Sequence, residues 1–321
     1  MKTLEELHKM IDEELKNNSS VSSLPELYEP VCYMLSLGGK RMRPVLTLLA
    51  CEMFGGKTED ALPAAIGIEL FHNFTLMHDD IMDKAPLRRN NETVFKKWNE
   101  NIAILSGDVL LVRAYQNISK TKNEKLKQIL EIFSKTAVKV CEGQQLDMNY
   151  EKQNIGIEQY LKMIEMKTAV LLAASLKIGA VIGNAGKKDS ENIFEFGKNT
   201  GLAFQLRDDL LDVYGEEKKT GKQKGGDIIA NKKTFLFLKA IEKADRYKKE
   251  ELLNWTQSAD AKEKVEAVKA IYDFLDIKSE TEKVIKNYSE KAFSHLDKIL
   301  TNPEKKQMLR KLVKNLKQRE G

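Results

Sequence analysis

Two stretches of the chain each carry three aspartates in the spacing Asp-Asp-x-x-Asp. They are Asp79-Asp80-Ile81-Met82-Asp83 and Asp208-Asp209-Leu210-Leu211-Asp212. On a helix, carboxylates at i, i+1 and i+4 fall within an arc of about 100°, where they repel one another unless cations lie between them. Mg2+ prefers oxygen ligands and usually shares its remaining positions with water and substrate phosphate. The pattern therefore predicts two halves of a Mg2+ site that face each other across a cavity.

The surroundings of these motifs bear on an alternative explanation. A single motif of this kind is also typical of a solvated acidic helix face. Both copies, however, are flanked by Leu, Ile, Met or Phe rather than by Lys, Glu and Ser. Two copies in apolar surroundings favour a functional site.

Basic residues occur where they could complete an anion site. Gly38-Gly39-Lys40-Arg41-Met42-Arg43-Pro44 places three cations after a glycine pair, and such backbone and side-chain donors suit phosphate. Arg88-Arg89 follows the first aspartate motif beyond Pro86, which should end or bend the helix. Metal ions and arginines that converge on one point describe a diphosphate site. Taken alone, the glycine stretch is also compatible with a basic turn in water.

Three weaker signals accompany these motifs. Lys167-Thr168 opens an apolar run that ends at Gly183, and this lysine could simply extend to solvent. The loop Gly215–Lys233 is rich in lysine and glycine; it could close over phosphates or be an ordinary surface loop. His72 lies two helical turns before Asp79, but a lone histidine near a core is more often structural.

The elements that must position these residues are expected to be helices. Apolar residues recur at helical spacing, for example at Leu126, Ile129, Phe133 and Ala137. The chain shows neither alternation of period two nor an Asn-Gly hairpin signal, so we expect no sheet. The helix from about Asn123 continues its apolar face into Gln144 and Asp147-Met148. A polar group on such a face needs a partner or lines a cavity, unless the helix end meets solvent.

Composition limits the class of protein. The 321 residues are 42% hydrophobic and 31% charged, with six prolines, a globular profile that favours long helices. The net charge of +5 is too small to indicate nucleic-acid binding but suits an anionic substrate. Three cysteines without a C-x-x-C pair, and an N-terminus unlike a signal peptide, predict a cytoplasmic protein. The apolar stretch 169–183 is too short for a membrane span. We expect one all-α domain over residues 1–321, a helical bundle.

Taken together, these motifs resemble the trans-isoprenyl diphosphate synthases, the polyprenyl synthetase family. The resemblance rests on an ordered set between residues 38 and 234. Its members are the Gly38–Pro44 stretch, both aspartate motifs, Arg88-Arg89, Ile104-Leu105-Ser106-Gly107-Asp108, Lys167-Thr168, Phe204-Gln205-Leu206-Arg207 and Gly221-Lys222. It implies an all-helical fold around a central cavity, usually a homodimer, and a transferase. The implied reaction is 1'-4 condensation of isopentenyl diphosphate with an allylic diphosphate.

The resemblance also implies a role for each matching residue. Mg2+ would bridge the allylic diphosphate to Asp79, Asp80, Asp83, Asp208, Asp209 and Asp212. The same diphosphate would contact Arg88, Lys167, Lys222 and Lys232, or Lys233 in place of Lys232. Isopentenyl diphosphate would contact Gly39, Lys40, Arg43, His72 and Arg89. Thr168 and Gln205 would offer oxygens to the allylic cation and complete the catalytic set with Lys167.

Two positions bear on how closely the chain follows the family. The family often has Gly-x-Pro-Thr-x-His after the arginine pair, where this chain has Asn90-Asn91-Glu92-Thr93-Val94-Phe95. Phe74 lies five residues before Asp79, about 7.5 Å along the helix, where the family uses a bulky residue as a floor beneath the growing tail. Thr75 beside it is small. We therefore expect C15–C20 products, unless Phe74 is ordinary core.

Two other functions share part of this pattern of motifs. A terpene cyclase shares the first aspartate motif but normally carries an Asn/Ser/Glu metal motif in place of the second, and this chain has Asp208, Asp209 and Asp212 there. A non-catalytic partner subunit would be expected to lose aspartates, and all six are present. The sequence favours a Mg2+-dependent short-chain prenyltransferase.

Overall fold

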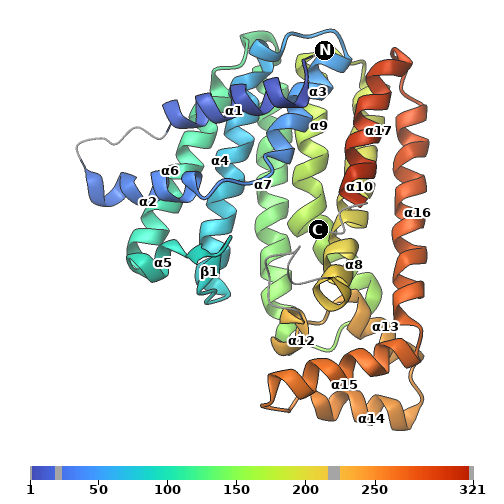
Figure 1. Ribbon diagram of the computed structural model, residues 1–321. Helices are drawn as coiled ribbons and strands as arrows, with labels where there is room; N and C mark the ends of the chain where they lie inside the picture. The colour runs from blue at the N-terminus through green and yellow to red at the C-terminus, as the bar shows by residue number, and fades with distance from the viewer. Residues whose placement is uncertain (1, 19–23, 216–224, 318–321) are drawn as a thin grey trace. The chain divides into compact units, whose positions relative to one another are not determined.

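The computed structural model describes residues 2–18, 24–215 and 225–317, and these are predominantly helical (Figure 1). The α-helices and one π-helical turn, η1, are α1 Leu4–Asn17, α2 Pro25–Ser36, α3 Met42–Met53, α4 Thr58–Met82, α5 Val94–Lys97, α6 Glu100–Ser119, α7 Asn123–Lys152, α8 Ile157–Ile164, η1 Glu165–Ala169, α9 Val170–Ile182, α10 Lys187–Tyr214, α12 Gly226–Ile229, α13 Phe235–Lys243, α14 Arg246–Trp255, α15 Ala261–Phe274, α16 Ile277–Asp297 and α17 Pro303–Lys317. The prediction of an all-α fold is confirmed. None of the described helices is long and apolar enough to cross a membrane.

The chain divides into two compact units. Unit 1 comprises Met1–Thr136, Ala174–Phe194 and Ile299–Leu309, and unit 2 comprises Ala137–Ala173, Glu195–Lys298 and Arg310–Gly321. The first aspartate motif lies in unit 1 and the second lies in unit 2.

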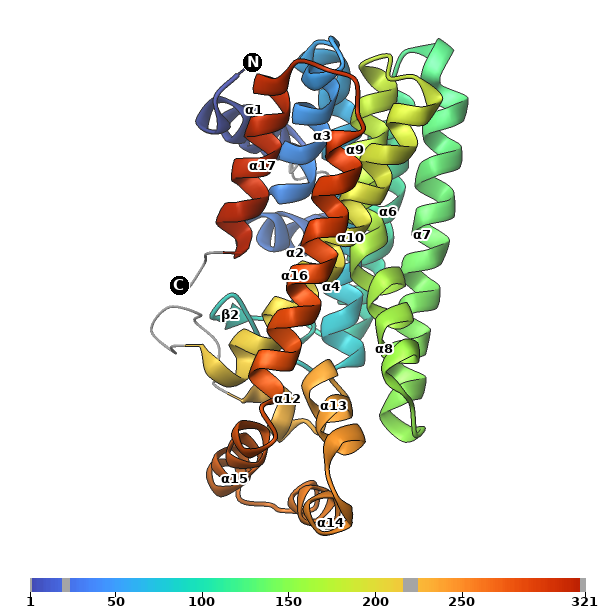
Figure 2. The same ribbon diagram turned by 90° about the vertical axis from the view of Figure 1, so that its right-hand side faces the viewer.

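In unit 1, α4 lies along α6 and α3 (Figures 1 and 2). Its apolar residues, among them Ile66, Leu70 and Phe71, are buried because they recur at helical spacing. The α4–α6 approach is close: a Cβ at Gly67 would lie 2.6 Å from Ile118 Cγ1, and one at Gly107 would lie 2.5 Å from His78 Cδ2. The tight packing makes α4 a firm support for the aspartates at its C-terminal end.

In unit 2, the packed side chains around Leu206 and Leu210 of α10 form a core with residues of α8, α13, α15 and α16. Helices α14 and α15 lie side by side (Figure 2). The second aspartate motif therefore sits on a helix whose other face is buried.

The apolar stretch 169–183 forms α9, and its residues are almost all buried. In unit 1 this helix approaches α3 closely: a Cβ at Gly179 would lie 2.8 Å from the Thr47 carbonyl carbon, and one at Gly183 would lie 3.0 Å from Phe54 Cβ. The sequence-based interpretation of this stretch as a buried helix is confirmed.

One element contradicts the expectation of no sheet. Strands β1 (Leu87–Arg88) and β2 (Asn91–Glu92) form an antiparallel hairpin. The two residues between them, Arg89 and Asn90, have φ of 53° and 62°. Positive φ at both central positions is the geometry of a type I′ turn, which asparagine tolerates without glycine. The expectation was wrong because this turn is Arg89-Asn90 and lacks the Asn-Gly pair that usually signals a hairpin.

Candidate active site

The first aspartate motif lies at the C-terminal end of α4. Asp79 and Asp80 belong to its last turn, and Asp83 is the C-cap residue. A helix C-terminus carries about half a negative charge from its macrodipole, so three carboxylates there are unfavourable without a cation. The Asp79 side chain is 19% exposed and Asp83 is exposed, whereas Asp80 is buried. Asp79 and Asp83 are thus the members that a ligand can reach.

Arg88, on β1, supplies positive charge to this motif. Its Nε lies 2.8 Å and its Nη2 2.5 Å from Asp80 Oδ1. Burial raises the pKa of Asp80 above its ordinary value, although Arg88 opposes that rise. The structure therefore places one of the two predicted arginines beside the aspartates. Arg88 fixes Asp80, the middle aspartate of the motif, through a forked, charge-assisted hydrogen bond.

Arg89 is directed elsewhere, toward the glycine-rich stretch. Its Nη1 donates a hydrogen bond to the Gly38 carbonyl oxygen. A Cβ at Gly39 would lie 2.8 Å from Arg89 Nη2 and 2.9 Å from its Cζ, so only glycine leaves room for the guanidinium. Neighbouring Lys40 is exposed, and its carbonyl oxygen lies 3.2 Å from His8 Nε2. Two segments far apart in sequence thus form one basic cluster.

Arg43 and His72 belong to the same part of unit 1. Arg43 Nη1 lies 3.0 Å from His72 Nε2. A guanidinium can only donate, so this nitrogen accepts and the neutral ring carries its proton on Nδ1. Burial, with Arg43 and Arg89 nearby, holds the pKa of His72 well below its ordinary value. His72 is therefore a neutral imidazole with an N–H to offer.

The structural role of Arg41 was not predicted from the sequence. It is 6% exposed and adopts φ of 43°. Its Nη1 donates to Glu69 Oε1 at 2.8 Å and its Nη2 to the Leu35 carbonyl at 2.8 Å. One guanidinium thus ties the Gly38–Pro44 stretch to α2 and α4. A buried acidic Glu69 amid apolar residues was the available signal, since such a group needs a partner.

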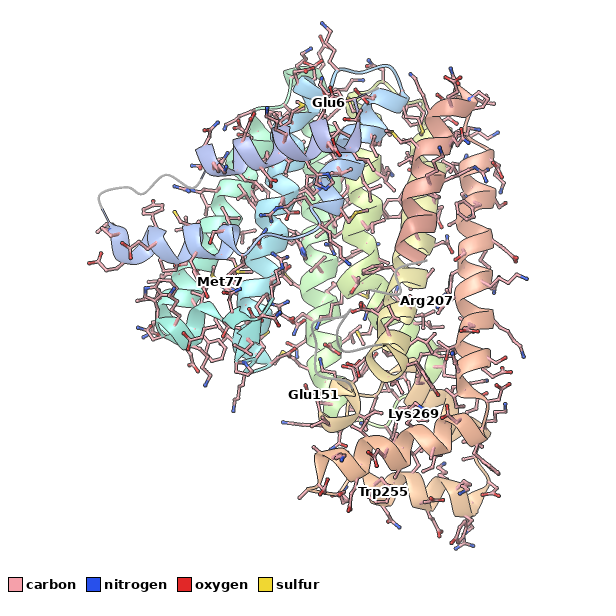
Figure 3. All side chains as sticks on the ribbon, viewed as in Figure 1. Glu6, Met77, Glu151, Arg207, Trp255 and Lys269 are labelled. Atoms are coloured by element: carbon pink, nitrogen blue, oxygen red, sulfur yellow. The ribbon has the colours of Figure 1, made fainter. Side chains whose placement is uncertain are left out.

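The second aspartate motif occupies the last turns of α10, directly after Arg207, which is labelled in Figure 3. Asp209 is 4% exposed. The Tyr160 hydroxyl donates to its Oδ2, and Gln205 Nε2 donates to its Oδ1 at 3.1 Å. Asp208 and Asp212 are partly exposed. In both motifs the second aspartate is therefore buried and fixed, and the other two are within reach of solvent.

The hydrogen bonds continue from this motif to η1. Gln205 Oε1 accepts from Thr168 Oγ1 at 3.2 Å. The predicted catalytic pair Thr168 and Gln205 is thus brought together and joined to Asp209. The buried Tyr160 was not among the predicted residues, because its hydroxyl meets Asp209 only after folding.

Asp209 is expected to make stability depend on pH in metal-free protein. Burial and the nearby Asp227 raise the pKa of Asp209 to about 7, against about 3.9 in an unfolded chain. The folded state then holds the proton more tightly. The contribution of Asp209 to stability is therefore fully present below about pH 4 and is lost as the pH rises to about 7, by a few kcal/mol. Chemical denaturation in EDTA should show a free energy of unfolding that falls less between about pH 5 and pH 8 in Asp209→Asn than in wild type. Parallel profiles would contradict this assignment.

Lys232 and Lys233, which follow the second motif, have different surroundings in the structure. Lys233 Nζ donates to the carbonyl oxygens of Tyr150, Glu151 and Gln153 at 2.9, 3.1 and 2.5 Å, and so caps the C-terminal end of α7. Lys232 is exposed. Lys222 lies outside the described residues.

Comparison with known proteins decides the family. The polyprenyl synthetase family model matches residues 24–275. The chain belongs to the polyprenyl synthetase family. A short chain isoprenyl diphosphate synthase from Methanocaldococcus jannaschii is 44% identical over 76% of this chain and 74% of its own length. A crystal structure of a geranylgeranyl pyrophosphate synthase superposes with a TM-score of 0.95 at 42% identity and covers both chains fully. A polyprenyl synthase from Caulobacter crescentus, complexed with calcium and isoprenyl diphosphate, gives a TM-score of 0.86 at 27% identity, covering 99% of this chain and 95% of that one.

The donor set of this polyprenyl synthetase fits a hard divalent cation. The available ligands are carboxylate oxygens, which Mg2+ and Ca2+ prefer. Among the described residues, no three His, Cys, Asp or Glu side chains form a ready metal cage. Mg2+ in phosphate sites is held by one or two carboxylates plus substrate oxygens. Two pairs of accessible carboxylates meet this requirement for Mg2+ ligands: Asp79 with Asp83, and Asp208 with Asp212.

Phe74 of the synthetase belongs to an aromatic cluster on α4. Its ring lies 5.6 Å from Phe71 and 4.7 Å from His78, centroid to centroid, and Phe71 in turn lies 5.2 Å from Phe133. Phe74 is only partly buried. The neighbouring Thr75 hydroxyl donates back to the His72 carbonyl at 2.8 Å. Phe74 is therefore held firmly by other rings yet keeps accessible surface.

Proposed function

We propose that this short-chain prenyl diphosphate synthase condenses isopentenyl diphosphate with an allylic diphosphate, 1'-4 and trans, to give a C15–C20 prenyl diphosphate. The observation that carries the proposal is the pair of aspartate motifs. Each lies at the C-terminal end of a long helix, with one buried and fixed aspartate and two that a ligand can reach. Both the macrodipole and the clustered carboxylates favour bound cations there.

In this proposal the six aspartates of the two motifs would hold Mg2+ for binding of the allylic diphosphate. When bound, the metal would act as a Lewis acid and stabilise the negative charge that develops on the leaving diphosphate. Arg88, Lys167, Lys222 and Lys232 would hold the same diphosphate. Lys232 is preferred to Lys233 because the latter donates to three carbonyl groups. Thr168 and Gln205 would turn oxygens toward the allylic cation.

Isopentenyl diphosphate would bind the basic cluster of unit 1, at Gly39, Lys40, Arg43, His72 and Arg89. Arg89 is already seated against Gly39 and Arg43 against His72, so these donors are preorganised. The double bond of isopentenyl diphosphate attacks the allylic carbon. A new C–C bond forms, diphosphate departs, and the proton lost from the condensed product can pass to that diphosphate.

We further propose a cytoplasmic homodimer in which residues 1–321 form one domain. The family match runs through both units. On α6, Ile104, Leu105 and Val112 are 43%, 57% and 57% exposed and lie on one side of the helix. In α7, Leu126 and Leu130 lie in a shallow, open surface depression. Exposed apolar surface of this kind is typical of subunit contacts.

Purified protein with Mg2+, labelled isopentenyl diphosphate and a panel of allylic diphosphates tests the proposal. We expect elongated prenyl diphosphates whose formation stops with EDTA. Hydrocarbon release without isopentenyl diphosphate would instead identify a terpene cyclase. No turnover by the protein alone would identify a partner subunit.

Replacing Phe74 with alanine should lengthen the product by one or more isoprene units. The partly buried ring would no longer close the space beneath the tail, and removing it leaves a cavity that a longer chain can enter. Chromatography of dephosphorylated products measures the chain length. Phe133→Leu is the control, since Phe133 is buried in the same cluster and should alter stability more than length. If Phe74→Ala made products of unchanged chain length, Phe74 would not be the residue that limits the growing tail.

A further inference from the structure

Asp147 of α7 has a partner that explains its place on an apolar helix face. Its Oδ2 lies 2.6 Å from Lys167 Nζ, and the two side chains are 27% and 22% exposed. Because both side chains are largely buried, salt screens this ion pair less than it screens an ion pair on the surface. The polar residue that looked anomalous in the sequence is therefore matched by the lysine of the Lys167-Thr168 motif.

The backbone around this pair is held closely. Gly143 lies one helical turn before Asp147, and a Cβ there would lie 2.7 Å from Lys167 Cα and from the Met166 carbonyl carbon. On α10, a Cβ at Gly201 would lie 2.6 Å from Ala169 Cα. The π-helical turn η1 thus contacts the backbones of α7 and α10 through two glycines. The position of Lys167 relative to Asp147 is set by main-chain packing.

The π-turn also separates two neighbouring side chains. Lys167 is directed to Asp147 on α7, whereas Thr168 donates to Gln205 on α10. Single π-turns inside helices occur frequently at functional sites. Here the turn allows consecutive residues to have different, fixed partners.

We infer that Asp147 is a positioning residue for Lys167, and this inference rests on the proposed role of Lys167 at the allylic diphosphate. A free lysine side chain has many rotamers, and immobilising it on binding lowers affinity. Asp147 restricts the ammonium before substrate arrives. It contacts no phosphate in this role, because a carboxylate would repel one.

The test compares Asp147→Asn, Lys167→Met and the double variant, with Glu142→Gln as the control for loss of an exposed carboxylate on the same helix. Asparagine has the shape of aspartate, and the melting temperature verifies folding. We expect Asp147→Asn to lower kcat/KM for the allylic diphosphate about 10- to 100-fold and to leave the KM of isopentenyl diphosphate unchanged. In Lys167→Met, adding Asp147→Asn should have no further effect. Affinity for inorganic pyrophosphate, measured by calorimetry, should fall in both single variants.

Several outcomes would overturn the inference. Wild-type kinetics in Asp147→Asn, or additive losses in the double variant, would show that Asp147 does not act through Lys167. Normal allylic kinetics in Lys167→Met would instead refute the proposed role of Lys167. An equal rise in the KM of both substrates would indicate a general structural defect, and would also count against positioning.

Discussion

Asp79→Asn is expected to lower kcat by about 10^3-fold while leaving metal-free protein at least as stable as wild type. Asp79 is one of the two reachable carboxylates in the first motif, and its loss removes an oxygen ligand for the cation. The same change removes a negative charge from the C-terminal end of α4, where the macrodipole and the neighbouring aspartates oppose it. Steady-state kinetics across Mg2+ concentrations, with thermal melts in EDTA, measure both effects.

Asp60→Asn is the matched control for this prediction. Asp60 lies in the first turn of the same helix and pairs with Lys122 at 2.9 Å near the surface. Such pairs contribute about 1 kcal/mol or less, so activity should stay near wild type. If Asp79→Asn remained active, or lost stability along with activity, the carboxylate would be structural rather than a metal ligand.

Gly39→Ala is expected to raise the KM for isopentenyl diphosphate about 100-fold and to leave the KM for the allylic diphosphate nearly unchanged. The added Cβ would lie 2.8 to 3.0 Å from three atoms of the Arg89 guanidinium, which must then move. A charge-assisted hydrogen bond to a ligand contributes about 1.5–3 kcal/mol, and this corresponds to the expected loss. Initial rates with each substrate varied in turn separate the two KM values.

Gly38→Ala separates backbone strain from the contact with Arg89. Gly39 has φ of 139° and Gly38 has φ of 75°, but a Cβ at Gly38 meets nothing within 4 Å. It should lower stability by about 1–2 kcal/mol and leave isopentenyl diphosphate binding intact. If Gly38→Ala and Gly39→Ala raised the KM for isopentenyl diphosphate equally, backbone strain rather than the contact between Gly39 and Arg89 would determine the affinity for this substrate.

Residues that act through local patterns were predictable. Helical periodicity predicted α7, and the spacing of the aspartates in each motif predicted that they share one arc of a helix. The hairpin was missed because Arg89-Asn90 is not the usual turn pair, although asparagine tolerates its positive φ. Arg41 and Tyr160 were missed for another reason: each is defined by a buried partner, and the partner of Tyr160, Asp209, is 49 residues away.

The sequence by itself determined the class of this protein, since ordered motifs, helical periodicity and an oxygen-rich donor set all depend on residue type and short spacing. Only the tertiary structure decided which aspartate in each motif is buried, that Lys233 caps α7, and that Asp147 holds Lys167. The physical reason is that burial and hydrogen-bond partners arise from contacts between segments 8 to 83 residues apart. No local pattern encodes which of several like side chains will meet such a partner.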